Sequence, residues 1–256
     1  MMTQTDRLHF LISYMQQEKN IEQSVPDSFN ERFEVFRGLA NERPAVKISR
    51  EFLDVQDAFL SEYNAGNVTE FESLKPVKKQ LYIWQGDITA LRIEAIVNAA
   101  NPEMLGCLIP NHNCIDNIIH TKAGAELRLE CAELMKKQGR KEAVGRAKIT
   151  SAYNLPADYV IHTVGPVVQD ERVSQMKQDL LAKCYKSCLE LARQKEIKTI
   201  AFCSISTGVF GYPKEKAAEI AVNTVQEYLE ETGSEIKVVF NVFSKDDLKI
   251  YKNLLT

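Results

Sequence analysis

The chain has 256 residues, of which 45% are hydrophobic and 26% charged, a composition typical of a folded globular protein. The formal net charge of −3 gives no electrostatic reason to expect a nucleic acid or an anionic membrane as the main partner. The N-terminal residues show no basic segment followed by an apolar one, and no apolar run is long enough for a membrane span, so we expect a cytoplasmic protein. Its six cysteines do not indicate a disulfide scaffold.

Residues 1–75 predict a helical N-terminal extension that packs on the main body or on itself. Apolar side chains recur at helical spacing in three stretches: Leu8, Leu11, Ile12 and Met15; Phe29, Phe33, Phe36 and Ala40; and Ile48, Phe52, Val55 and Phe59. Ser28 followed by Glu31 is a capping-box pattern, and Ala65-Gly66-Asn67 ends the last stretch. Amphipathic helices of this kind gain most of their stability from packing. We find no chemical constellation here, so packing explains the extension better than a partner-docking surface does, and residues 67–78 predict a linker.

From residue 79 onward, predicted strands alternate with predicted helices. The strands fall at 81–84, 95–98, 149–153, 159–164, 198–203 and 236–243, and the helices at 115–137, 173–195, 213–232 and 245–255. This alternation predicts an α/β domain over residues 79–256, with a sheet between helical layers. Ligands of such folds bind at the carboxyl ends of the strands, so the polar loops at 85–89, 98–102, 204–213 and 241–244 are the places to look for a site.

The loop at 204–213 has the features of a phosphate cradle. Gly208 and Gly211 allow the backbone to approach a ligand, and Pro213 opens the next helix at its first position. The backbone N–H groups of a helix N-terminus favour phosphate, and Ser206 and Thr207 add hydroxyl donors. By its residues alone, this loop fits a phosphate cradle and a plain strand-to-helix turn equally well.

Two thiols and an imidazole lie close together at Cys107, His112 and Cys114. Thiolate and neutral imidazole are ligands that Zn²⁺ prefers, and three protein ligands with an open fourth position are typical of a catalytic zinc. A surface loop whose cysteines lie near a histidine by chance is the alternative. The other cysteines, Cys131, Cys184, Cys188 and Cys203, are better explained by core packing.

Three further positions could serve a nucleotide. Asp87, at a strand end, could accept a hydrogen bond from the exocyclic amine of a base, or cap the next turn. Ile115-Asp116 opens a helix whose N-terminal amides could bind a second phosphate. Phe243 could stack on a base, although filling the core is the commoner role of a phenylalanine.

Four motifs, in this order, resemble those of the macrodomain: Gly86-Asp87-Ile88-Thr89, Ile96-Val97-Asn98-Ala99-Ala100-Asn101, Ile115-Asp116-Asn117-Ile118-Ile119-His120 and Ser206-Thr207-Gly208-Val209-Phe210-Gly211-Tyr212-Pro213. The resemblance covers about residues 79–256 and is closest to the MacroD-type group. Within that group, the Cys/His ligands and the helical extension resemble the zinc-dependent branch from bacteria and fungi.

The resemblance implies an ADP-ribose cleft in a three-layer α/β/α fold with a mixed central sheet. Asp87 would bind the adenine amino group, Ile88 would line the base pocket, and Phe243 would pack against the adenine. Asn101 would contact the distal ribose, while Ile115 and Asp116 would lie near the phosphates and that ribose. The loop from Ser206 through Thr207, Gly208 and Val209 to Phe210 would wrap the diphosphate.

The implied activity is hydrolysis that removes ADP-ribose from mono-ADP-ribosylated protein, with an ester to an acidic side chain as the bond broken. Asp116 and Asn101 would be the catalytic residues. MacroD-type proteins usually carry a run of glycines where this chain has His112-Asn113-Cys114, a departure that favours Zn²⁺ as a cofactor over metal-free activation of water. A non-catalytic ADP-ribose reader, an O-acetyl-ADP-ribose deacetylase and a zinc that only staples the loop remain alternatives. The resemblance also implies, as partner, a lipoyl-carrier protein modified by a sirtuin-type transferase.

Overall fold

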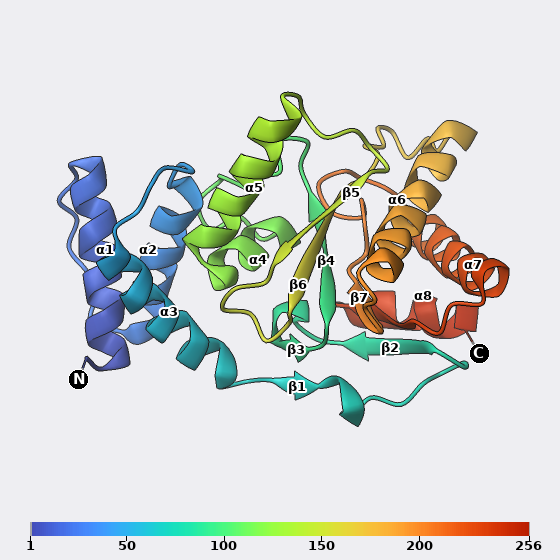
Figure 1. Cartoon of the computed structure of the whole chain (residues 1–256), viewed down its shortest axis with the longest axis horizontal. Helices are drawn as coiled ribbons and strands as arrows, with labels where there is room; N and C mark the ends of the chain where they lie inside the picture. Colours follow the sequence, from blue (N-terminus) through green and yellow to red (C-terminus); the bar gives the residue numbers. More distant parts are fainter. Residues whose placement is uncertain (1, 256) are drawn as a thin grey trace.

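The computed structural model describes residues 2–255, and its N-terminal part is a bundle of three helices (Figure 1). These are α1 (Gln4–Lys19), α2 (Phe29–Glu42) and α3 (Arg50–Ala65). Each begins at a side-chain cap, because the hydroxyls of Thr3, Ser28 and Ser49 accept hydrogen bonds from backbone N–H groups of the first turn. The predicted apolar faces meet in a core of their own, in which Leu8, Leu11, Ile12, Phe52 and Phe59 are almost completely buried.

Six strands form the central sheet in the order β2-β8-β7-β4-β6-β5. Their bounds are β2 (Leu81–Gln85), β8 (Lys237–Val242), β7 (Thr199–Phe202), β4 (Ala95–Ala100), β6 (Tyr159–Val164) and β5 (Ala147–Ser151). All neighbouring pairs run parallel except β5, which is antiparallel to β6. Strand β4 lies inside the sheet, and its residues Ile96 and Val97 are completely buried, as the apolar run predicts.

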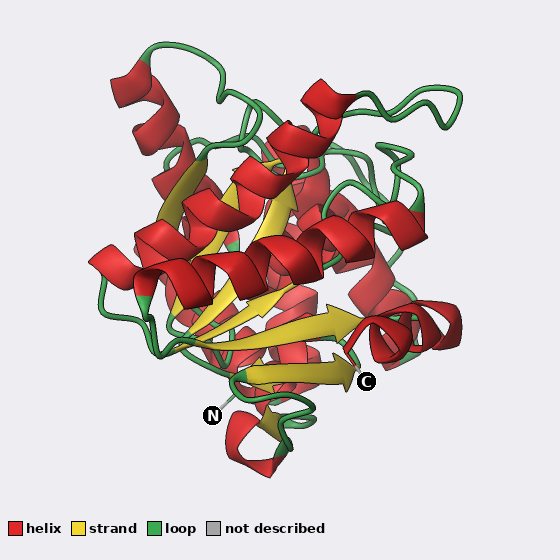
Figure 2. Ribbon diagram, turned by 90° about the vertical axis from the view of Figure 1, so that its right-hand side faces the viewer, coloured by secondary structure: helices red, strands yellow, loops and turns green. Residues whose placement is uncertain are grey.

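Helices cover both faces of this sheet (Figures 1 and 2). One layer holds α4 (Ile115–Ala123) and α5 (Ala125–Gln138), and the other holds α6 (Gln175–Gln194), α7 (Lys214–Thr232) and α8 (Lys245–Leu255). The predicted three-layer α/β/α fold with a mixed sheet and a helical extension is therefore confirmed. Helices α2 and α3 pack against α4 on its outer side. Within residues 2–255, no helix combines the length and the apolar character that crossing a membrane requires.

The single helix predicted at 115–137 is wrong, because the chain breaks at Gly124 into α4 and α5. Gly124 has φ +101°, and a Cβ there would lie 2.6 Å from Nε2 of Gln56 in α3. The side chain of Gln56 accepts a hydrogen bond from the N–H of Ala125 at 2.9 Å, which starts the second helix. The break is thus made by a tertiary contact from the extension.

Two smaller predictions also need correction. The segment predicted as a linker at 67–78 contains β1 (Thr69–Glu70), which pairs with β3 (Leu91–Arg92), and a 3₁₀ helix, η1 (Phe71–Ser73). Phe71 is buried in the main core and fixes this segment. The strand predicted at 149–153 begins and ends two residues earlier, because Ala147–Ser151 pair with β6 and Tyr153 turns away with φ +53°. A second 3₁₀ turn, η2 (Ile88–Ala90), follows β2.

Candidate active site

A cleft of about 850 Å³ opens at the carboxyl ends of the parallel strands, the edge at which α/β folds bind ligands. Its size suits a nucleotide-sized molecule. Every residue predicted to bind ligand or metal lines this one cleft: Asp87, Ile88, Asn101, Cys107, His112, Cys114, Ile115, Asp116, Ser206, Thr207, Gly208, Val209, Phe210 and Phe243. The structure therefore brings together side chains from loops that are far apart in the sequence.

The end of the cleft that is predicted to bind a base is formed by the loops after β2 and β8. Oδ1 of Asp87 caps the η2 turn by accepting hydrogen bonds from the N–H and the hydroxyl of Thr89, at 3.0 and 2.6 Å. Its Oδ2 pairs with Nζ of Lys122 in α4 at 2.7 Å. Burial raises the pKa of Asp87, but the Lys122 charge and the hydrogen bonds outweigh burial, and the pKa lies below its ordinary value. Phe243 is 79% exposed, so it does not fill the core and is free to stack on a ligand.

The loop at 204–213 approaches the cleft closely with its backbone. The hydroxyl of Ser206 is buried and has no hydrogen-bond partner among the described residues. A Cβ at Gly165, on the opposite side, would lie 2.1 Å from this hydroxyl, so only glycine fits there. Gly211 has φ +67°, and its N–H donates to the carbonyl of Gly208 at 2.9 Å. Helix α7 begins at Lys214, one position later than predicted, and Pro213 is its N-cap residue rather than its first helical residue.

The carboxylate of Asp116 is buried at the centre of the cleft. Its Oδ1 accepts from the side-chain amide of Asn98 at 2.8 Å, and its Oδ2 accepts from that of Asn101 at 3.2 Å. Burial raises the pKa of Asp116 to about 6, although these amides and the charge of Arg128 act to lower it. At neutral pH the group is therefore mostly a carboxylate with the proton affinity of a general base.

A second histidine lies behind this carboxylate. Nε2 of His120, one helical turn along α4, is 3.6 Å from Oδ1 of Asp116. Burial lowers the pKa of His120 well below its ordinary value, so the ring is neutral at physiological pH. His120 also lies close to Cys131 and His162 in a buried group whose ligand-type atoms are all within 4.8 Å of one another. Nε2 of His162 already has a partner in the core, because the hydroxyl of Thr150 lies 2.9 Å from it.

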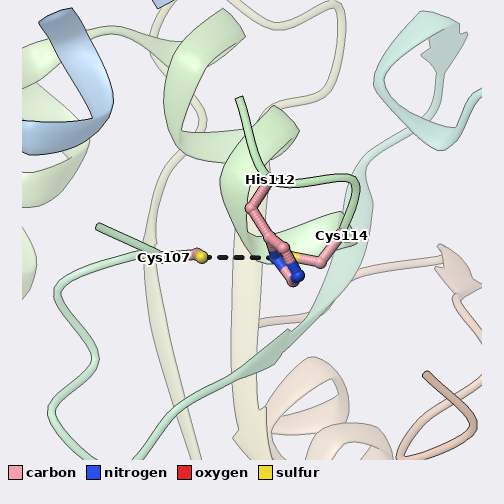
Figure 3. Close-up of side chains that lie close together, drawn as sticks. All are labelled: Cys107, His112 and Cys114. Atoms are coloured by element: carbon pink, nitrogen blue, oxygen red, sulfur yellow. Dashed lines mark hydrogen bonds between the residues drawn. The ribbon is translucent and has the colours of Figure 1, made fainter. Parts of the chain in front are cut away.

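Three ligand-type side chains converge in the loop before α4. The ligand atoms of Cys107, His112 and Cys114 all lie within 4.8 Å of one another, with Sγ of Cys107 3.5 Å from Nδ1 of His112. Figure 3 shows the three side chains turned toward each other. Burial, together with the nearby Cys107, raises the pKa of Cys114 to about 12. A soft donor set of two sulfurs and one nitrogen fits Zn²⁺. The other cysteines are buried free thiols, as predicted.

Two cations that line the cleft or pair with a residue lining it were not predicted from the sequence. Lys122, which pairs with Asp87, belongs to a helix recognised by its apolar residues. Arg37 lines the cleft from α2 of the extension, a segment predicted to carry no chemistry. No local pattern in the sequence marks either residue, because both act on partners far away along the chain.

Comparison with known proteins gives one consistent family. Residues 97–221 match the Macro domain family. The chain is 58% identical over 249 residues to the protein-ADP-ribose hydrolase of Staphylococcus aureus (strain MRSA252), covering 96% of this chain and 94% of that protein. It is 47% identical over 178 residues to the ADP-ribose glycohydrolase MACROD2 of Xenopus laevis, covering 69% of this chain and 40% of that protein.

A solved structure gives the same result. The Trypanosoma brucei macrodomain in complex with ADP-ribose superposes with a TM-score of 0.67 at 32% identity, covering 82% of this chain and 92% of that chain. The Staphylococcus aureus relative matches nearly the whole chain, the solved structure shares its fold, and the predicted site residues line one cleft. This chain therefore belongs to the Macro domain family.

Proposed function

We propose that this macrodomain is a MacroD-type protein-ADP-ribose hydrolase that uses zinc. One observation carries the proposal: Asp116, Asn101 and the Cys107–His112–Cys114 cluster all line the same cleft as the base-binding and phosphate-binding loops. A protein that only reads ADP-ribose needs the cleft but not a metal-ligand set with room for another ligand. The names of the relatives in Staphylococcus aureus and Xenopus laevis support hydrolysis.

The cleft residues hold the nucleotide so that its distal ribose lies near Asp116. Asp87, with Ile88 beside it, takes the adenine amino group, and Phe243 packs on the ring. The backbone of the Ser206–Phe210 loop and the unpartnered Ser206 hydroxyl take the diphosphate. Asn101 and Asp116 are then left to contact the distal ribose and a water molecule.

The reaction breaks the ester bond between the distal ribose and an acidic side chain of the modified protein. Asp116 accepts a proton from the attacking water, whose oxygen becomes the new hydroxyl of free ADP-ribose. The side-chain carboxylate leaves with the electron pair of the bond, and the proton passes from Asp116 to solvent. Asn98 and Asn101 hold both oxygens of Asp116, so the base is oriented before the substrate arrives.

Cys107, His112 and Cys114 would hold the zinc. When bound, the metal would supply Lewis-acid chemistry beside the distal ribose. The resemblance extends the proposal to a lipoyl-carrier protein, modified on an acidic side chain, as the substrate.

The test pairs metal analysis with hydrolysis by the full chain. Release of ADP-ribose is measured from two modified proteins, a lipoyl-carrier protein and an unrelated protein modified on acidic residues, before and after chelation and after zinc is restored. We expect release that is lost with zinc and recovered with it.

The other outcomes separate the alternatives. Binding without release makes the protein a reader, and faster turnover of O-acetyl-ADP-ribose makes it a deacetylase. Full activity of zinc-free protein removes the metal from the mechanism and leaves the hydrolase. If removing zinc lowers thermal stability and substrate affinity together, with no selective loss of kcat, zinc only stabilises the loop.

A further inference from the structure

The loop that carries the metal ligands has no regular secondary structure of its own. Residues 105–114, here called the metal loop, contain neither helix nor strand. Side chains from other elements hold its carbonyl groups. Nε of Arg128 donates to the carbonyl of Leu105 at 2.7 Å, and the side-chain amide of Asn117 donates to that of Ile109 at 3.0 Å. The positions of the metal ligands therefore depend on residues outside the loop.

Helix α2 of the N-terminal extension supplies two of these residues. Nη2 of Arg37 donates to the carbonyl of His112 at 2.9 Å, so it holds a metal-ligand residue directly. Oδ1 of Asn41 accepts from the N–H of Asn111 at 3.0 Å. Arg37 and Asn41 are four residues apart and share one face of the helix. Together they bond the loop at two consecutive residues, Asn111 and His112.

The same two side chains also reach Asn117, the residue in α4 that holds the carbonyl of Ile109. Nε of Arg37 donates to Oδ1 of Asn117 at 3.0 Å. The amide of Asn41 donates to the hydroxyl of Thr121 at 2.9 Å, and that hydroxyl donates to the carbonyl of Asn117 at 2.9 Å. Arg37 therefore orients Asn117 directly, and Asn41 does so through Thr121.

Docking of the extension also has an apolar part. The apolar faces of α1–α3 already pack against Ala125 and Leu129 of α5. Asn41 is 1% exposed, and burying an amide at such a contact is unfavourable unless all its hydrogen bonds are made. Here both ends of the amide are satisfied, one of them by the metal loop.

We infer that Arg37 and Asn41 are positioning residues for the metal loop, and that the N-terminal extension is therefore part of the catalytic site. The role of the metal in this statement rests on the proposed function, but the dependence of loop order on α2 does not. In these contacts, the extension bonds the backbone of the metal loop at Asn111 and His112. It also bonds the side chains of Asn117 and Thr121 in α4. None of these bonds is made to a ligand atom of the proposed metal site.

The test compares Arg37→Met and Asn41→Ala with Arg7→Met in the full chain. Arg7 is the matched control, since it bonds Glu62 and the carbonyl of Ala58 in α3 and loses no bond to the metal loop. Two quantities are measured: hydrogen exchange of the amides of residues 105–114, and the rate at which zinc passes to a chromogenic chelator. Affinity for ADP, which lacks the distal ribose, checks that the rest of the cleft is intact.

We expect exchange of the Asn111 amide and release of zinc to rise about ten- to hundredfold in Arg37→Met and Asn41→Ala, with the Arg7→Met protein unchanged. ADP affinity should stay unchanged in Asn41→Ala, because Asn41 is not among the residues that line the cleft. If either protein fails to fold, Arg37→Lys decides, because lysine keeps the charge but cannot make both bonds of the guanidinium fork. If the amides of residues 105–114 exchange at the wild-type rate in these variants, the inference is wrong. A wild-type protein that binds no zinc counts against the metal in the proposed function, and the exchange comparison then still decides the role of α2.

Discussion

The side-chain amide of Asn101 lies 3.2 Å from Oδ2 of Asp116 and couples the loop after β4 to the first turn of α4. The same amide donates to the carbonyl of Gly106 at 3.0 Å, next to Cys107. One asparagine thus joins the proposed general base to the loop that carries the proposed metal ligands. A shift in either part moves the other.

Replacing the base tests the chemical step. Asp116→Asn keeps the size of the side chain but cannot accept a proton, and its amide would face the donors of Asn98 and Asn101. We expect kcat to fall by about 10²–10⁴-fold. Affinity for ADP should stay close to that of the wild type, since ADP lacks the distal ribose. Steady-state hydrolysis and calorimetric binding give both quantities, and a kcat above half of the wild-type value would show that another group is the base.

Lys122 keeps Asp87 ionised in the base-binding end of the cleft. In Lys122→Met, burial of Asp87 is no longer opposed by a cation, so the pKa of Asp87 rises from its lowered value. The wild-type carboxylate is retained down to below its ordinary pKa of 3.8, and any binding that depends on it is lost only as the pH falls through the lowered value. We expect the variant to lose ADP affinity at a higher pH than the wild type does. Binding measured from pH 4 to pH 8 tests this, and Asp87→Asn is the control that should remove the difference.

Gly211 and Gly208 form a matched pair in the phosphate loop. Gly211 has φ +67°, and an added Cβ would lie 2.8 Å from the carbonyl oxygen of Val168, whereas a Cβ at Gly208 would meet nothing within 4 Å. Gly211→Ala should lower the free energy of unfolding by about 1–2 kcal/mol or more. Gly208→Ala should change it by less than about 0.5 kcal/mol. Denaturant unfolding decides, and equal losses in the two variants would contradict the strain argument.

Phe243 is 79% exposed, so replacing it should change ligand binding without changing the stability of the fold. Phe243→Ala should leave the thermal midpoint nearly unchanged. Its affinity for ADP should fall by about 1–3 kcal/mol, the usual contribution of stacking between an aromatic side chain and a base. Met176→Ala is the control, since Met176 is also exposed, at 66%, but does not line the cleft. If Phe243→Ala binds ADP as well as the wild type does, the adenine does not stack on this ring.

The main body could be predicted from the sequence because its strands and helices have clear periodicities. The strand predicted at 159–164 is β6 residue for residue, and the last strand and helix lie within one residue of their predicted bounds. The break at Gly124 could not be predicted, because Gln56, from another helix, makes it. A helical pattern that continues through a glycine does not reveal which tertiary contact requires that glycine.

The site residues named from the sequence were predictable in the same way, because each lies in a loop that follows a strand or in the first turn of the next helix. The residues that hold them were not. Lys122 and Asp87 are 35 positions apart, and Arg37 is 75 positions from His112. Hydrogen bonds over such distances leave no periodic trace in the sequence. Polar pairing between the extension and the metal loop becomes visible only when the chain is folded.

The 75 to 80 residues between Arg37 and its partners also separate them in time during synthesis. At about 5–20 residues per second, helix α2 leaves the ribosome roughly 4–16 seconds before the metal loop does. Arg37 and Asn41 are therefore already synthesised when the loop residues that they bond are made. The first segment of the chain to be made thus supplies Arg37 to the lining of the finished cleft.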